Sequence, residues 1–387
     1  MTRISSALLL AATAASWSGC GGTDPGGPDE SASIVGTVRA AETDAPLQGA
    51  EVTAGSVVAT TDAAGSFELA GLPSGATATI RSERPGFVEY SAAIAVQAGS
   101  NSHDIRMTRQ SLYTRQDIAI YIPPNVAVVR GVILSLGGPP THGVATGVFD
   151  LPDPAWNASL LAMRVSLLAL ATKYSLAVMG ADGNGGAALS EARLLGALDA
   201  FAVSSDHPEL AQAPLLIQGI SGGSPEAYDL AVQRPDRTIG FALQIPRTPT
   251  TGQSAATQRV PAYIMLAEDD QVVRNDLTLL YFEANRAEGA LWALAIEPGV
   301  GHAAGSAAGL SLIVEWMDTI LGLRLPSAVT PGMPVTLQAV DESSGWLGNR
   351  DSFAIATFAS YVGDQRQASW LPSQPLAEQW KGFVTPD

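Results

Sequence analysis

The sequence predicts an α/β protein, a mostly parallel sheet with helices on both faces, preceded by a small all-β sandwich. From residue 110 onward, apolar strand-like runs alternate with helix-length segments, which is typical of a parallel sheet covered on both sides. Between residues 34 and 109 the runs are short and are separated by Gly, Pro and Asp turns, which indicates a sandwich. A strand, a tight turn and a helix surround Ser221. That pattern places a candidate site at the carboxyl end of a central strand.

The composition is that of an acidic globular protein. The 387 residues carry a formal charge of −16, and the only lysines are Lys173 and Lys381. Such a field would repel nucleic acid and anionic membrane surfaces, so we expect neither as a partner. Cys20 is the single cysteine, which excludes an intrachain disulfide and a cysteine-based metal site.

The N-terminus is expected to direct export. Residues 1–19 combine Arg3 with a short apolar stretch and small residues, the pattern of a secretory signal peptide. Ser18, Gly19 and Cys20 resemble the lipobox of bacterial lipoproteins, although Trp17 stands where leucine is usual. The resemblance implies a lipidated Cys20 that holds a cell-envelope protein (periplasm or outer membrane) by its anchor alone, with plain secretion as the alternative. Residues 20–33, rich in Gly, Pro, Asp and Ser, predict a flexible linker.

Residues 34–109 are predicted to contain strands at 34–38, 50–53, 57–60, 66–69 and 76–80. The segment resembles the carboxypeptidase regulatory-like (transthyretin-like) family. The matching residues include Gly36, Val38, Pro46, Leu47, Gly49, Val52, Asp62, Gly65, Phe67, Pro85, Gly86 and Phe87. The resemblance implies an accessory module without catalytic residues. We interpret His103 and Asp104 as a solvated turn rather than a metal site, because no second ligand cluster accompanies them.

Residues 110–325 are predicted to form the sheet domain. We expect strands at 128–136, 176–179, 215–218, 239–245, 262–266 and 291–296, and helices at 160–172, 189–203, 276–288 and 303–321. Residues 326–387 contain Trp346, Trp370 and Trp380 and are too aromatic for a disordered tail. We expect this C-terminal extension to pack on the sheet domain, with a strand or short helix at 353–361 and an amphipathic helix at 375–384.

The turn Gly219-Ile220-Ser221-Gly222-Gly223 is the centre of the predicted site. Glycines two residues before and after the serine remove Cβ atoms that would block a strained turn. A serine nucleophile needs a nearby base, and of the four histidines only His302 follows Ser221 in the chain. His302 lies after the 291–296 strand, on a loop at the same sheet edge. The alternatives are a turn without chemistry and a histidine that caps the next helix.

Three carboxylates, Glu268, Asp269 and Asp270, follow the 262–266 strand, which gives the chain order serine, acid, histidine. Here the sequence resembles the α/β-hydrolase superfamily, whose acid loop commonly matches Ala267, Asp270 and Val273. The resemblance implies Asp270 as the acid, with Asp269 as the second choice.

The same resemblance implies an oxyanion hole made by the backbone N–H groups of Gly222 and Gly138. Leu136 stands before that second loop's first glycine, where the family often has histidine, and Pro139 and Pro140 carry no N–H. The alternative is that these glycines serve only the turn.

The signal-like N-terminus and this resemblance together imply an exported serine hydrolase that cleaves a small-molecule or polymer ester, and no cofactor or metal is implied. The connection 245–261 is too short for a large cap, so we expect an open site shaped by residues 141–157, with Phe149 and Trp156 as pocket walls. Two alternatives remain, a surface binding protein on an inactive hydrolase scaffold and a peptidase of the prolyl-oligopeptidase type. The acyl and alcohol groups, the role of the sandwich and the oligomeric state do not follow from the sequence.

Overall fold

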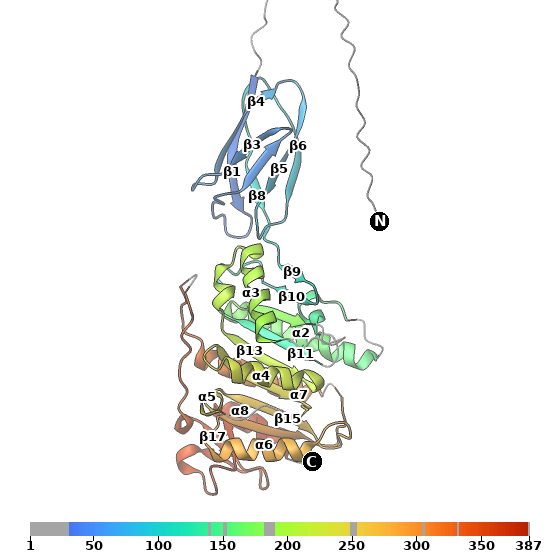
Figure 1. Cartoon of the computed structure of the whole chain (residues 1–387), viewed down its shortest axis with the longest axis vertical. Helices are drawn as coiled ribbons and strands as arrows, with labels where there is room; N and C mark the ends of the chain where they lie inside the picture. Colours follow the sequence, from blue (N-terminus) through green and yellow to red (C-terminus); the bar gives the residue numbers. More distant parts are fainter. Residues whose placement is uncertain are drawn as a thin grey trace, which may run out of the picture.

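The computed structural model describes residues 31–137, 141–149, 153–181, 190–247, 254–303, 306–330 and 333–385, without the side chain of His142. The predicted signal peptide, Cys20, most of the 20–33 linker and Gly138 lie outside these ranges. A β-sandwich stands at one end of a larger α/β body, next to its helix α3 (Figure 1).

The sandwich consists of two four-stranded sheets. One contains β1 (Ser31–Ala40), β4 (Ser66–Pro73), β7 (Gly99–Ser102) and β8 (Ile105–Met107), and the other contains β3 (Val57–Thr60), β2 (Glu51–Ala54), β5 (Thr77–Glu83) and β6 (Tyr90–Ala95). Inward-facing Ile34, Val52, Leu69 and Ile80 are fully buried between the sheets. The sequence did not predict β6 to β8. Strand β7 has no apolar residue, and it is held by parallel pairing with β1.

His103 and Asp104 connect β7 to β8. Asp104 is exposed, as expected of a turn, but its carboxylate accepts hydrogen bonds from the backbone N and the hydroxyl of Thr37, both at 2.9 Å. His103 is half-buried, and its Nε2 lies 3.0 Å from the hydroxyl of Tyr90. Both side chains thus attach this connection to neighbouring strands, so our interpretation of them as a solvated turn was incomplete.

The body contains an eight-stranded sheet in the order β16-β15-β14-β13-β11-β12-β10-β9. Its strands are β9 (Leu112–Arg115), β10 (Ile118–Tyr121), β11 (Val132–Gly137), β12 (Ala177–Ala181), β13 (Leu215–Ile220), β14 (Thr238–Gln244), β15 (Ala262–Ala267) and β16 (Trp292–Glu297). β11 to β16 run parallel, whereas β10 is antiparallel to both β12 and β9. The fold is therefore that of an α/β-hydrolase with an N-terminal β-sandwich, as the sequence predicted.

The sheet differs from the sequence prediction in two places. The first is the β9–β10 hairpin, which the sequence did not predict. The strand expected at 128–136 begins only at Val132, because the preceding residues form a connection in which the N–H of Val129 donates to the buried carboxylate of Glu209 at 2.6 Å.

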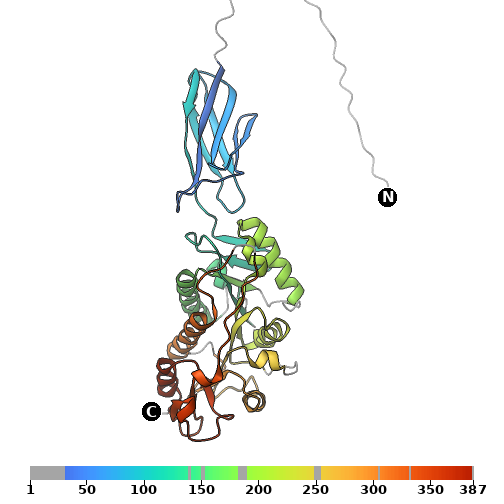
Figure 2. The same cartoon turned by 90° about the vertical axis from the view of Figure 1, so that its left-hand side faces the viewer.

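Helices cover both faces of the sheet, as the edge-on view of Figure 2 shows. One face carries α2 (Pro154–Tyr174) and α7 (Ala307–Arg324), and the other carries α3 (Glu191–Ser205), α4 (Ser224–Gln233) and α6 (Asn275–Ala287). Short helices α1 (His142–Thr146) and α5 (Ala255–Gln258) lie in connections. Ser190 and Ser306 accept backbone N–H groups at the starts of α3 and α7, which satisfies groups that a helix leaves unpaired. This cap starts α7 four residues later than the expected 303.

The C-terminal extension forms β17 (Trp346–Gly348), β18 (Ile355–Thr357), β19 (Ser369–Leu371) and α8 (Gln374–Val384). Residues 353–361 contain both alternatives that the sequence offered, since β18 is followed by a 3-10 turn at Phe358–Ser360. The indole N–H of Trp380 donates to the carbonyl of Leu294 at 2.8 Å, and the hydroxyl of Ser369 donates to the same carbonyl at 3.0 Å. The extension therefore satisfies backbone groups of β16, which would otherwise be an open sheet edge.

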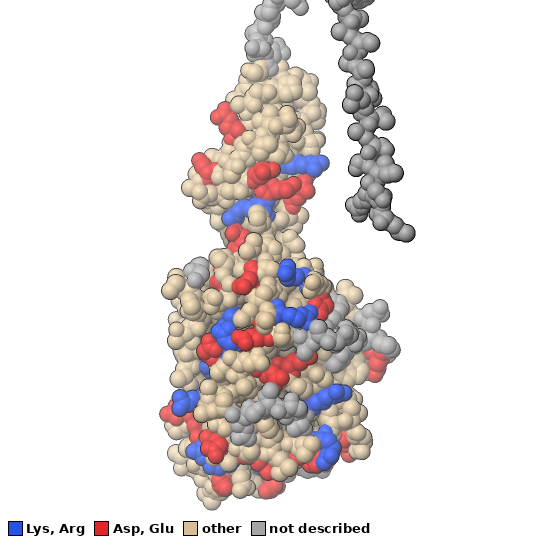
Figure 3. Space-filling model, in the orientation of Figure 1, with Lys and Arg blue, Asp and Glu red and all other residues tan. Residues whose placement is uncertain are grey.

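The sandwich and the body touch directly. Arg84 of the sandwich pairs with Asp206 after α3 at 2.7 Å, and a Cβ at Gly86 would lie 2.4 Å from the carbonyl oxygen of Ser205. On the face shown in Figure 3, basic side chains of the body mostly lie near acidic ones, with wide uncharged areas between them.

Candidate active site

Ser221 lies on a strained turn between β13 and α4. Its φ is +49°, a left-handed conformation that is costly for a residue with a side chain. A Cβ at Gly219 would lie 2.7 Å from Cβ of Ala227, and one at Gly223 would lie 2.4 Å from the carbonyl carbon of Leu136. Only glycine fits at these two positions without movement of backbone or helix. The turn therefore has the tight strand-to-helix geometry that presents a serine above the sheet.

The structure brings His302 to this serine. The Oγ of Ser221 lies 2.9 Å from Nε2 of His302, and Nδ1 of the same ring lies 2.7 Å from Oδ2 of Asp270. The three side chains come from the ends of β13, β15 and β16, which are separated in sequence but meet at one edge of the sheet. A serine hydroxyl next to an imidazole whose far nitrogen meets a carboxylate is the arrangement that activates a serine nucleophile.

Both carboxylate oxygens of Asp270 accept hydrogen bonds. Its side chain is 0% exposed, and Oδ1 accepts the backbone N–H groups of Val272 and Val273 at 2.8 and 3.1 Å. Burial by itself would raise the pKa of Asp270, but the hydrogen bonds from His302, Val272 and Val273 outweigh it and hold the pKa below its usual value. Asp270 therefore stays a carboxylate near neutral pH.

The neighbouring carboxylates have different contacts. The backbone N–H of Asp269 donates to the carbonyl of Val300 at 2.9 Å, while its side chain is exposed. Glu268 accepts the N–H of Gly299 at 2.8 Å. These bonds join the acid loop to the histidine loop, and only Asp270 among the three contacts the imidazole.

A small apolar cluster includes Ile220, which precedes Ser221, and Ala267 at the end of β15. Leu160, Ile220, Ile245 and Ala267 form a buried cluster against which Phe149, Trp156 and Val300 pack. Phe149 and Trp156 had been expected as pocket walls. The side chain of His302 is 16% exposed, so a substrate can reach its imidazole.

Of the two predicted oxyanion donors, Gly222 lies in the described part of the chain. Gly222 follows Ser221 in the 3-10 turn Ser221–Gly223 that leads into α4, where the helix end favours negative charge. Gly138 lies outside the described residues and remains a prediction. Among the described residues, no group of three or more His, Cys, Asp or Glu side chains could hold a metal ion.

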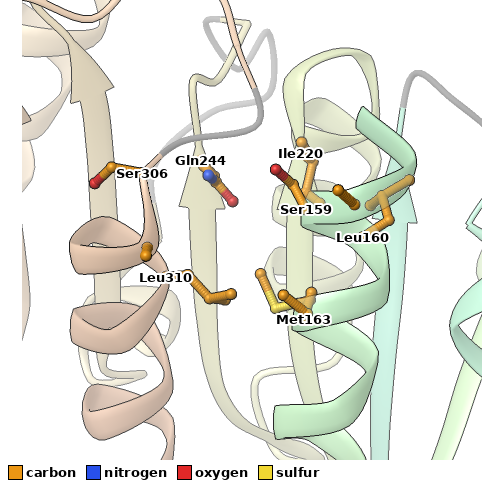
Figure 4. A pocket seen from close by; sticks show the side chains of 10 residues that line it. Ser159, Leu160, Met163, Ile220, Gln244, Ser306 and Leu310 are labelled. Carbon is orange, nitrogen blue, oxygen red and sulfur yellow. The ribbon is translucent and has the colours of Figure 1, made fainter. Parts of the chain in front are cut away.

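Sequence reasoning missed a cavity beside the nucleophile, between α2 and α7 (Figure 4). Its walls come from two helices that are distant in the chain, so periodicity could not reveal it. The run of small residues Ala155, Ala158, Ser159 and Ala162 in α2 was the available signal, because small side chains on a packed helix leave space.

A comparison with known families identifies the N-terminal sandwich. Residues 33–108 match the carboxypeptidase regulatory-like domain family and form a domain of that kind. No curated protein matches the chain in sequence.

Among solved structures, Candida antarctica lipase A in its closed state is 12% identical and has a TM-score of 0.41, with 80% of this chain and 89% of that chain covered. A bacterial heroin esterase is 17% identical and has a TM-score of 0.37, with 53% and 79% covered. A type II cohesin–X-dockerin complex from Acetivibrio cellulolyticus is 18% identical and has a TM-score of 0.19. The match covers 21% of this chain and 59% of that one, so the chain spans less than two thirds of that relative.

Proposed function

We propose that this protein is a serine hydrolase that cleaves carboxylic esters through an acyl-enzyme. The observation that supports the proposal most strongly is the hydrogen-bonded chain from Ser221 through His302 to Asp270. A binding protein would gain nothing from a serine held at a φ of +49°, because such strain costs on the order of 1–3 kcal/mol.

In the first half of the reaction, Nε2 of His302 takes the proton of Ser221 as Oγ attacks the ester carbonyl. The carbonyl oxygen gains negative charge, which the N–H of Gly222 stabilises from the start of α4. The imidazolium then gives its proton to the departing alcohol. Asp270 fixes the ring and stabilises its positive charge.

In the second half, water takes the place of the alcohol. His302 removes a proton from the water as it attacks the acyl-enzyme carbonyl. The imidazolium then returns that proton to Oγ of Ser221 as the acyl bond breaks and the acid leaves. In each half Nε2 first takes a proton and then gives it up, so His302 ends each half in the state in which it began.

The test compares the wild type with Ser221→Ala on two readouts, turnover of p-nitrophenyl acetate and covalent labelling by a fluorophosphonate. Both should disappear in the variant, and both should persist in Ser166→Ala, which removes a serine from the outer surface of α2. A folded wild type that is not labelled would contradict the hydrolase and favour the surface binding protein. Labelling with turnover of peptides but not esters would favour the peptidase.

Export and a lipid anchor belong to the same proposal. The signal-like residues 1–19 and the lipobox-like Cys20 support it. In a bacterial host, Cys20→Ser should abolish incorporation of labelled palmitate and move the protein from the membrane to the soluble fraction. Equal palmitate incorporation in the variant would exclude Cys20 as the anchor.

A further inference from the structure

A cavity of about 240 Å³ lies between α2 and α7, over the carboxyl ends of β13 and β14. In Figure 4, Met163 of α2 and Leu310 of α7 point toward each other across it, and Ile220 and Gln244 lie at its other end. Ala158 and Ala307 complete the two helical walls.

The cavity lies next to the two segments that carry the reacting side chains. Ile220 lies directly before Ser221, and Ser306, which also lines the cavity, comes four residues after His302. Along the chain, the lining therefore begins one residue from the nucleophile and four residues from the base.

The lining suits a hydrocarbon chain. None of the described residues that line the cavity is charged, and Leu160, Met163, Ile220 and Leu310 present apolar side chains. The hydroxyl of Ser306 is already used, because it accepts the N–H of Gly309 at 3.0 Å as the cap of α7. At roughly 30 Å³ for a group the size of a water molecule or a methylene, the space holds about eight such groups.

We propose that this cavity binds the acyl chain of the ester and selects unbranched chains of up to about eight carbons. The inference rests on the proposed ester hydrolysis at Ser221. The alcohol must leave before water can attack, whereas the acyl chain stays bonded to Oγ through both halves of the reaction. A recess beside the nucleophile can therefore hold the acyl chain in both halves of the reaction, whereas it could hold the alcohol only in the first.

The expected signature is a dependence of kcat/KM on acyl length. Each methylene buried in the transition state should raise kcat/KM by up to about fourfold until the cavity is full. Longer chains should gain nothing further, because Ala158, Ser306 and Ala307 of the lining are exposed and the extra methylenes would extend into solvent.

The experiment measures kcat/KM of the full chain for p-nitrophenyl esters from acetate to palmitate, and for acetates of alcohols from methanol to octanol. Two variants change the cavity in opposite directions. Ala158→Leu with Ala307→Leu narrows it from both helices, and Leu310→Ala widens it. Ala169→Leu with Ala308→Leu is the matched control, since both alanines are exposed on the same helices and neither lines the cavity.

The narrowed variant should lose about 50-fold or more in the ratio of octanoate to acetate activity. The widened variant should extend the rise in kcat/KM to longer acyl chains, and the control should match the wild type. Acetate turnover with an acyl-length profile that no variant alters would overturn the inference, as would a change that follows alcohol length instead. Absence of acetate turnover and of fluorophosphonate labelling in the wild type would instead overturn the proposed function.

Discussion

At the scale of single residues, the hydrogen bonds of Asp270 distinguish it clearly from the neighbouring carboxylates. Oδ2 faces His302 while Oδ1 accepts two backbone N–H groups, so the carboxylate cannot rotate without losing three hydrogen bonds. Asp269 is adjacent in sequence but points to solvent. The sequence left both open, because a run of acids does not show which one faces the histidine.

Asp270→Asn should lower kcat for p-nitrophenyl acetate by about 10²–10⁴-fold, since the amide cannot hold the imidazole tautomer that accepts the serine proton. Asp269→Asn is the matched control and should stay within about twofold of the wild type, because it removes a charge that makes no contact with His302. Steady-state kinetics on both folded variants checks this. Equal losses in the two variants would contradict Asp270 as the orienting acid.

The lowered pKa of Asp270 also makes the unfolding free energy depend on pH. A carboxyl group whose pKa is lower in the folded than in the unfolded state stabilises the fold above the unfolded value, about 3.9. That contribution is lost as the pH falls through the lower folded value. The difference in unfolding free energy between the wild type and Asp270→Asn should therefore shrink as the pH falls below about 4. Urea titrations at each pH measure it, and a difference that grows as the pH falls from about 4 would contradict the assigned direction.

At the scale of elements, the turn between β13 and α4 could be predicted because its requirement is local. The need for glycine at 219 and 223 follows from the close approach of one strand and one helix. The β9–β10 hairpin could not be predicted in this way. Its four-residue strand Ile118–Tyr121 is short, and it is fixed by antiparallel pairing with β12, sixty residues away in the chain.

Gly223→Ala should destabilise the body by about 2–4 kcal/mol and abolish turnover, because the new Cβ would overlap the backbone of Leu136 and displace β11 or the serine turn. Gly196→Ala is the opposite case. A Cβ there meets nothing within 4 Å on the exposed side of α3, and replacing glycine inside a helix should stabilise by about 0.5–1 kcal/mol. Denaturation of both variants by urea, with acetate turnover alongside, measures the contrast. A Gly223→Ala protein with wild-type stability would refute the steric reason given for that glycine.

At the scale of the whole molecule, the sequence indicated a sandwich, an α/β body and a C-terminal extension. It did not indicate which contacts attach the extension to the body. The apolar spacing of α8 predicted an amphipathic helix, and its burial of Leu376, Ala377 and Trp380 agrees with that. Nothing local indicates that Trp380 and Ser369 would meet one carbonyl of β16, since the partners are more than seventy residues apart. Such contacts depend on which sheet edge stays open after the parallel strands have formed.

This attachment implies that the extension stabilises the body. Trp380 is 1% exposed and lies in the core cluster shared with α7, so Trp380→Ala should lower the unfolding free energy by about 3–5 kcal/mol. Phe383→Ala, on the same helix but only half-buried, should cost about 1 kcal/mol. Tryptophan fluorescence reports the body selectively, because residues 31–109 contain no tryptophan. If the extension were merely attached to an independently stable hydrolase, both variants would unfold at the urea concentration of the wild type. A midpoint lowered in proportion to burial would instead make β17 to α8 part of the cooperative unit that holds His302 and Asp270 in place.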